Sequence, residues 1–226
     1  MRQNHLPLPA PESEPGWVGV LLLACLALLV LVKAVAYPRV LRIAQSTFRT
    51  QVLQQLEREE GNIFRPYAVA LNLLFLLNVA FLLYKYNENS PFVFKETSGG
   101  LQYLFFLGLS AGLLIFKLIF NRILILLTGA RKLLGEYTVS STLINQTFGL
   151  FLFPCLMLAE FSRVIPDIFL WAALLILLLS ILLKWYRGLV ICLGEQGLGF
   201  LQIFSYFCAL EILPVLVLVK YVVETH

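Results

Sequence analysis

Six long apolar runs, separated by short polar segments, dominate the hydropathy pattern of this chain. They cover residues 17–36, 67–84, 101–127, 139–161, 166–183 and 200–223. Each run has about 18 residues or more, the length at which an α-helix crosses roughly 30 Å of hydrocarbon. The pattern therefore predicts an all-α fold, a polytopic transmembrane bundle of about six spans.

The composition supports a membrane protein with little mass outside the bilayer. The chain is 60% hydrophobic and 13% charged, whereas soluble domains carry about 25% charged residues. Residues 1–16, with Pro7, Pro9 and Pro11, are expected to form a disordered tail, and 17–226 a single transmembrane domain. The longest loop, 37–66, is too short for a separate globular domain, so function must lie in the bundle, at its faces or in a partner.

Basic residues predict the orientation of the bundle. If the N-terminus lies outside, the inside segments carry about twice as many lysines and arginines as the outside segments, which the positive-inside rule favours. We therefore expect a multi-pass protein with both termini outside.

The first inside loop contains a helical apolar stripe. Ala44, Phe48, Val52 and Leu56 follow one another at four-residue spacing, which predicts an amphipathic helix over 40–59. Two interpretations stay open. The helix lies on the inner surface, with its arginines against anionic headgroups, or it continues the first span inward and packs on the bundle.

Several polar side chains fall within the apolar runs, where a charge is costly and usually has a partner. The candidates are Lys117, Asn121, Arg122, Asn145, Gln146 and Glu211, with Asn72 as a further member. Lys117 and Glu211 lie at similar depth, which predicts a buried ion pair, and the others form a second tier nearer the inner face. Three interpretations of these groups stay open: an interhelical hydrogen-bond network, a proton or substrate site, or a contact with the charge of a partner protein.

Two prolines interrupt apolar runs and predict helix kinks. Pro154 and Pro214 each remove one hydrogen bond, to the carbonyls of Leu150 and Leu210 respectively. The freed carbonyl near Glu211 either coordinates a cation or is satisfied by a hydroxyl or water, as in an ordinary kink.

The residues typical of metal and cofactor sites are scarce. The four cysteines form no Cys-x-x-Cys pair, and the two histidines, His5 and His226, lie in the tails. The glycines at 194, 197 and 199 are not followed by the Gly-Lys-Ser/Thr of a phosphate-binding loop. We therefore expect no metal site, no cofactor and no nucleic-acid partner.

Two segments carry a family resemblance. Residues 200–220, FLQIFSYFCALEILPVLVLVK, and 148–154, FGLFLFP, resemble the domain-of-unknown-function family 4271 of inner-membrane proteins from Bacteroidota. The most specific part surrounds Tyr206, Cys208, Glu211 and Pro214, and the resemblance covers nearly the whole chain. It implies a bacterial inner-membrane location with both termini periplasmic in the orientation above, and it brings no activity, substrate or catalytic residue.

Three classes of function are compatible with these observations. The first is a non-enzymatic scaffold or accessory subunit, whose partners are the lipid bilayer and a membrane protein or further copies of this chain. The second is a small proton-coupled transporter that uses Lys117, Arg122 and Glu211. The third is a membrane-embedded enzyme acting on lipid. The polar residues available to it at the outer face, Glu160, Arg163 and Asp167, are more typical of an ordinary loop rim.

Overall fold

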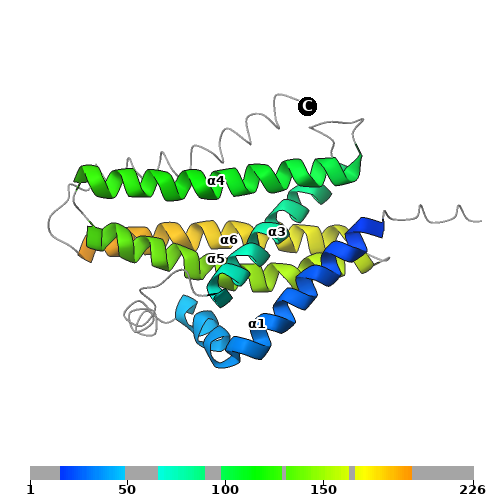
Figure 1. Cartoon of the computed structure of the whole chain (residues 1–226), viewed down its shortest axis with the longest axis horizontal. Helices are drawn as coiled ribbons and strands as arrows, with labels where there is room; N and C mark the ends of the chain where they lie inside the picture. The colour runs from blue at the N-terminus through cyan, green and yellow to red at the C-terminus, as the bar shows by residue number, and fades with distance from the viewer. Residues whose placement is uncertain (1–15, 49–65, 90–97, 129–130, 163–165, 195–226) are drawn as a thin grey trace, which may run out of the picture.

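The computed structural model describes residues 16–48, 66–89, 98–128, 131–162 and 166–194. These residues are all-α and contain no strand. Five helices account for almost all of them: α1 Gly16–Phe48, α3 Pro66–Asn89, α4 Gly99–Thr128, α5 Arg131–Phe161 and α6 Pro166–Gly194 (Figure 1).

Each of the five helices contains an apolar segment long enough to cross a membrane. These segments are Gly16–Ala34, Pro66–Glu88, Gly99–Ile123, Leu134–Phe161 and Asp167–Val190. They correspond to the first five predicted spans, so the structure supports a multi-pass membrane protein. The sixth predicted run, 200–223, lies outside the described residues.

The helices extend further than the apolar runs suggested. Helix α5 begins at Arg131, well before the run at 139–161, and α6 continues past the run at 166–183 to Gly194. Hydropathy marks only the part of a helix that lipid tails surround, whereas backbone hydrogen bonding continues into the headgroup region. The ends of the apolar runs were therefore poor guides to the ends of the helices.

The predicted amphipathic helix over 40–59 falls partly on α1. Its first residues continue the α1 backbone as far as Phe48, and 49–59 lie outside the described residues. The α1 ribbon changes direction in its C-terminal part (Figure 1), the part that contains Pro38. A proline inside a helix removes one backbone hydrogen bond and favours such a bend.

Helices α3 and α5 form the centre of the bundle. Helix α5 packs along α6 and against α3, and α3 also contacts α1 and α4 (Figure 1). The apolar segments of α3 and α5 are each 56% buried, against 17% for α4 and 11% for α6. The outer helices therefore present most of their apolar surface to their surroundings, as expected in lipid.

Two apolar clusters fill the bundle, and they differ in which helices contribute. The larger cluster draws on all five helices, with Leu22, Phe81, Phe106, Leu156 and Ala173 among its buried members. The smaller cluster contains Val32, Tyr67, Ala68, Leu71 and Leu143, from α1, α3 and α5. Helix α4 thus enters the apolar core along its N-terminal half, where Tyr103 and Phe106 lie.

A glycine brings the two central helices into close contact. A Cβ atom added to Gly149 of α5 would lie 2.9 Å from the Phe75 Cβ and 3.0 Å from the Phe75 Cα of α3. The same crossing carries a buried hydrogen bond, in which Asn78 Nδ2 donates to the Gly149 carbonyl over 2.9 Å. Small residues allow membrane helices to approach in this way, and a polar bond joins them.

Candidate functional site

Polar side chains gather in two places, one toward each end of the bundle. We call the first the Lys85 cluster: Lys85, Asn87, Glu88, Gln102 and Glu160. We call the second the Lys117 cluster: Lys117, Asn121, Tyr137, Thr138 and Ser141. The chain crosses between the two ends along each of the helices α3, α4 and α5, which is why both clusters draw on α4 and α5.

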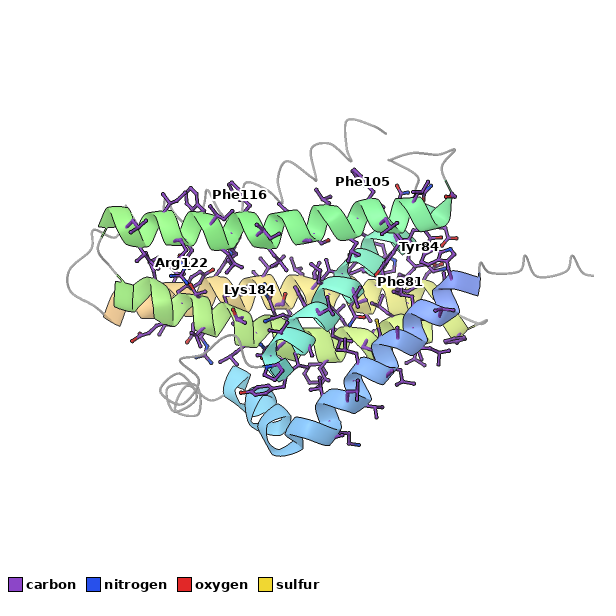
Figure 2. The ribbon with its side chains drawn as sticks, viewed as in Figure 1. Phe81, Tyr84, Phe105, Phe116, Arg122 and Lys184 are labelled. Atoms are coloured by element: carbon purple, nitrogen blue, oxygen red, sulfur yellow. The ribbon has the colours of Figure 1, made fainter. Side chains whose placement is uncertain are left out.

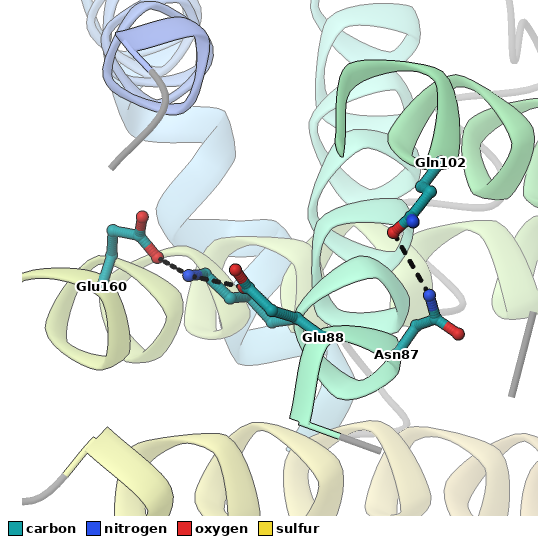
Figure 3. A network of polar contacts seen from close by, with 5 residues as sticks. Asn87, Glu88, Gln102 and Glu160 are labelled. Carbon is teal, nitrogen blue, oxygen red and sulfur yellow. Dashed lines mark hydrogen bonds and ion pairs between the residues drawn. The ribbon is translucent and has the colours of Figure 1, made fainter. Parts of the chain in front are cut away.

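An ion pair between two helices forms the centre of the Lys85 cluster (Figure 3). Lys85 Nζ on α3 lies 2.9 Å from Glu160 Oε2 on α5 and 3.0 Å from Glu88 Oε2 on its own helix. The Glu160 side chain is only 2% exposed, whereas that of Glu88 is 47% exposed. The bond to Glu160 is therefore the one that takes a carboxylate out of solvent and joins α3 to α5.

Neutral and aromatic groups extend the Lys85 cluster to α4 and α1. Asn87 Nδ2 donates to Gln102 Oε1 over 3.3 Å, which joins α3 to α4. The Trp17 ring lies 5.2 Å from that of Tyr84 and 5.5 Å from that of Tyr103. Tryptophan and tyrosine concentrate where the hydrocarbon meets the headgroups, so this arrangement is typical of a membrane boundary.

The Lys117 cluster lies between α4 and α5. Lys117 Nζ donates to Ser141 Oγ over 3.1 Å and to Tyr137 Oη over 3.5 Å, and it lies 5.3 Å from the Tyr137 ring centre. One turn further along α4, Asn121 Nδ2 donates to Thr138 Oγ1. The sequence analysis placed Lys117 in a central tier with Glu211, and Asn121 in a second tier nearer the inner face. The structure brings both Lys117 and Asn121 against the hydroxyl-bearing face of α5.

Helix α5 continues this polar character deeper into the bundle. Asn145 lies one turn beyond Ser141 on the same face. Gln146 turns toward α3, where its Nε2 donates to the Ala68 carbonyl over 3.3 Å. Three buried acceptor atoms, Ser140 Oγ, Asn145 Oδ1 and Gln146 Oε1, have no hydrogen bond within the described part of the chain. Buried polar atoms normally have partners, so this stretch of α5 is a candidate binding region.

Basic side chains accompany the Lys117 cluster. Arg122 is exposed on α4, while Lys184 and Arg187 are buried on α6, with Lys184 Nζ 5.6 Å from the Phe75 ring centre. Figure 2 places Arg122 and Lys184 toward the same end of the bundle, away from Tyr84. Arg122 was expected in the inner polar tier with Asn121, and the structure leaves it at the helix surface.

The remaining predicted site residues are placed as follows. Asn72 is only partly buried on α3, and α5 runs without interruption through Pro154. Glu211 and Pro214 lie outside the described residues, so the pair between Lys117 and Glu211 and the second kink stay predictions. Among the described residues, no group of three or more His, Cys, Asp or Glu side chains comes together to hold a metal.

The sequence interpretation missed the ion pair between Lys85 and Glu160. Both residues lie near the ends of apolar runs and were taken as loop-side charges, a position where exposed charges are common. Their positions in the sequence could have indicated the pair. Lys85 directly follows the run at 67–84, and Glu160 is the last residue but one of the run at 139–161. The two runs cross in the same predicted direction, so these ends meet at one face of the membrane.

Comparison with known proteins identifies a family and no characterised relative. No curated protein and no solved structure matches the chain. The family described as "Domain of unknown function (DUF4271)" matches residues 18–222, which include both polar clusters and all of the five described helices except the first two residues of α1. The chain belongs to this family.

Proposed function

We propose that this protein is a non-enzymatic, multi-pass protein of the bacterial inner membrane that serves as a scaffold or accessory subunit of a membrane assembly. The observation that carries the proposal is the use of its interior polar groups. Asn78, Gln146 and Glu160 each bond a different helix from their own. Polar groups used in this way hold a bundle together, and a rigid bundle suits a structural role.

The outer helices supply the surface for such an assembly. Phe105 and Phe116 lie on the side of α4 that faces away from α5 and α6 (Figure 2), and both are exposed. We propose that this face packs against another membrane protein.

Site-specific photocrosslinking tests the assembly role. A photoreactive amino acid at exposed Phe116 is compared in native membranes with one at Phe106, which is buried on the same helix. We expect a discrete adduct with a different protein at 116 and none at 106. Adducts with lipid alone, or only with a second copy of this chain, would contradict an accessory subunit.

We propose that both termini are periplasmic, with the Lys117 cluster toward the cytoplasm. The support is the concentration of Arg122, Lys184 and Arg187 toward that end. Cysteines introduced at Asn89 and Gly135 test the orientation in a background without the four native cysteines. An impermeant thiol reagent added to intact cells should modify the first and spare the second, and the reverse result would invert the bundle.

A small proton-coupled transporter using Lys117, Arg122 and Glu211 is the second candidate. The unbonded acceptors at Ser140, Asn145 and Gln146 favour it, because a water-filled path would satisfy them. In the same cysteine-free background, Asn145→Cys should then react with a small impermeant reagent from the Lys117 side. Ser180→Cys on α6, also buried, is the control, and equal protection of both would contradict the transporter.

A further inference from the structure

The two halves of α4 are attached to the bundle differently. The N-terminal half carries three buried residues, Tyr103, Phe106 and Ser110, and the first two belong to the larger apolar cluster. None of the residues 111–120 is buried, and no residue of α4 beyond Leu109 belongs to either apolar cluster. Within the described part of the chain, apolar packing therefore fixes only the N-terminal half of α4.

The described bonds between the C-terminal half of α4 and its neighbours are polar. Asn121 is the one buried residue there among those whose exposure the structure describes, and it donates to Thr138 of α5. One turn earlier, Lys117 donates to Ser141 and Tyr137. Hydrogen bonds between membrane helices are individually weak, so bonds of this kind can break and re-form.

Two glycines lie where the two halves of α4 meet. Gly108 and Gly112 are one turn apart near the middle of the apolar segment Gly99–Ile123. A Cβ atom added to either would meet nothing within 4 Å, so close packing within the described residues does not require them, in contrast to Gly149. Glycine inside a helix leaves the backbone freer to change its dihedral angles. Kinks occur at glycine and serine pairs, and Ser110 lies between these two glycines.

Exposure to lipid does not by itself explain glycines in the middle of a helix. Helix α6 is as exposed as α4, yet its residues 167–187 contain no glycine. Its buried residues include Leu170 and Ala173 toward one end and Lys184 and Arg187 toward the other. Helix α6 is thus packed along its length, whereas α4 combines a packed half, two central glycines and a half joined by polar bonds.

We propose that α4 bends at Gly108–Gly112, so that its C-terminal half swings away from α5 and opens the seam between the two helices. The straight α4 of Figure 1 is the closed form. Opening separates Asn121 from Thr138 and uncovers Ser141 and Asn145, which the closed form buries. Asn145 Oδ1 has no hydrogen bond within the described part of the chain, so the opened seam gives water access to an acceptor that needs a donor. The bend does not depend on the assembly role.

Pulsed electron paramagnetic resonance on the full-length protein in lipid vesicles tests the bend. In a background without the four native cysteines, spin labels at Ile123 of α4 and Tyr186 of α6 report the moving half. Labels at Leu104 and Ile168 report the fixed half, and all four residues are exposed. The first pair should give two distance populations and the second pair one. A single narrow population for both pairs would overturn the proposal.

Alanine substitutions locate the bend. Gly108→Ala combined with Gly112→Ala adds two Cβ atoms that meet nothing within 4 Å and favours the straight helix, so the longer-distance population of the first pair should fall about tenfold. Gly100→Ala lies at the start of the same helix, where the added atom also meets nothing, and should leave that population unchanged. Equal populations in the double variant and in Gly100→Ala would overturn the proposal.

A substitution on α5 should act in the opposite direction. Thr138→Val has a similar shape but lacks the acceptor for Asn121, so the longer-distance population should rise about threefold, the factor expected for one hydrogen bond between membrane helices. An unchanged population would overturn the proposal.

The reactivity of Asn145→Cys reports whether the bend opens the seam. In the same cysteine-free background, a small impermeant thiol reagent should modify this cysteine more slowly when both glycines are replaced by alanine. Equal rates with and without the two alanines would overturn the opening of the seam.

Discussion

The two ends of the bundle use polar side chains in different ways. In the Lys85 cluster, opposite charges meet and the bonds run from α3 to both α5 and α4, beside an apolar cluster to which all five helices contribute. In the Lys117 cluster, a lysine meets neutral hydroxyls between α4 and α5, and the neighbouring apolar cluster draws on α1, α3 and α5. Bonds at both ends join helices, but the first end uses a pair of opposite charges, whereas the described partners of the lysine at the second end are neutral hydroxyls.

The two ends therefore differ in how a charge within the membrane is compensated. A buried carboxylate next to its lysine is costly to disturb because the remaining charge loses its partner. The described partners of Lys117 are neutral, so removing one of these hydroxyls leaves no opposite charge without its partner. Substitutions at the buried ion pair and at the crossing of α3 and α5 should therefore destabilise the protein to different degrees.

The largest effect is expected at the buried carboxylate of the Lys85 cluster. Glu160→Gln should lower the free energy of unfolding by about 3 kcal/mol, since breaking a buried pair by removing one partner is strongly destabilising. Glu88→Gln removes the exposed partner of the same lysine and should change the free energy of unfolding by less than about 1 kcal/mol. Denaturant titration in detergent measures both, and equal losses would remove the distinction between the two carboxylates.

The close crossing of α3 and α5 should tolerate no added carbon atom. Gly149→Ala places a Cβ 3.0 Å from the Phe75 Cα, and the resulting overpacking should destabilise the fold by about 2 kcal/mol. Gly112→Ala on α4, where nothing lies within 4 Å of the new atom, is the matched control. It should be neutral or slightly stabilising. Thermal unfolding of the two variants in one detergent gives the comparison, and a harmless Gly149→Ala would contradict the packing.

A smaller effect is expected from the polar bond at the same crossing. Asn78→Ala removes the donor to the Gly149 carbonyl and should cost about 1 kcal/mol, within the range measured for hydrogen bonds between membrane helices. Asn72→Ala, earlier on α3 and only partly buried, should cost less. If the two substitutions cost the same, the bond at 78 does not contribute measurably to the association of α3 with α5.

Much of this architecture could be predicted from the pattern of apolar residues. Hydrocarbon excludes unpaired backbone groups, so a long apolar run has to form a helix, and the five described spans follow the runs closely. The ends of α5 and α6 could not be predicted in this way, because hydropathy reports contact with lipid and the helices continue beyond it.

The polar sites could be predicted only in part. The sequence indicates how deep a residue lies in the membrane, but not which neighbouring helix its side chain faces. Lys117 and Asn121 were predicted as buried polar residues from their depth, but in two separate tiers, although their four-residue spacing places them on one face of α4. Their partners Tyr137, Thr138 and Ser141 depend on how α5 is rotated, which side-chain packing decides. Lys85 and Glu160 are far apart in the chain, and only the meeting of α3 and α5 reveals that they form a pair.

The distances between α4 and α5 at the two ends test the central claim most directly. Spin labels at Leu101 and Phe161 report the Lys85 end, and labels at Ile123 and Glu136 report the Lys117 end, in full-length protein reconstituted in lipid. Pulsed electron paramagnetic resonance should give a narrow distance distribution for the first pair, because a buried ion pair and an amide bond restrain that end, and a broader one for the second. Equally narrow distributions for the two pairs would contradict the claim that the ion-paired end holds its helices more tightly than the hydroxyl-bonded end.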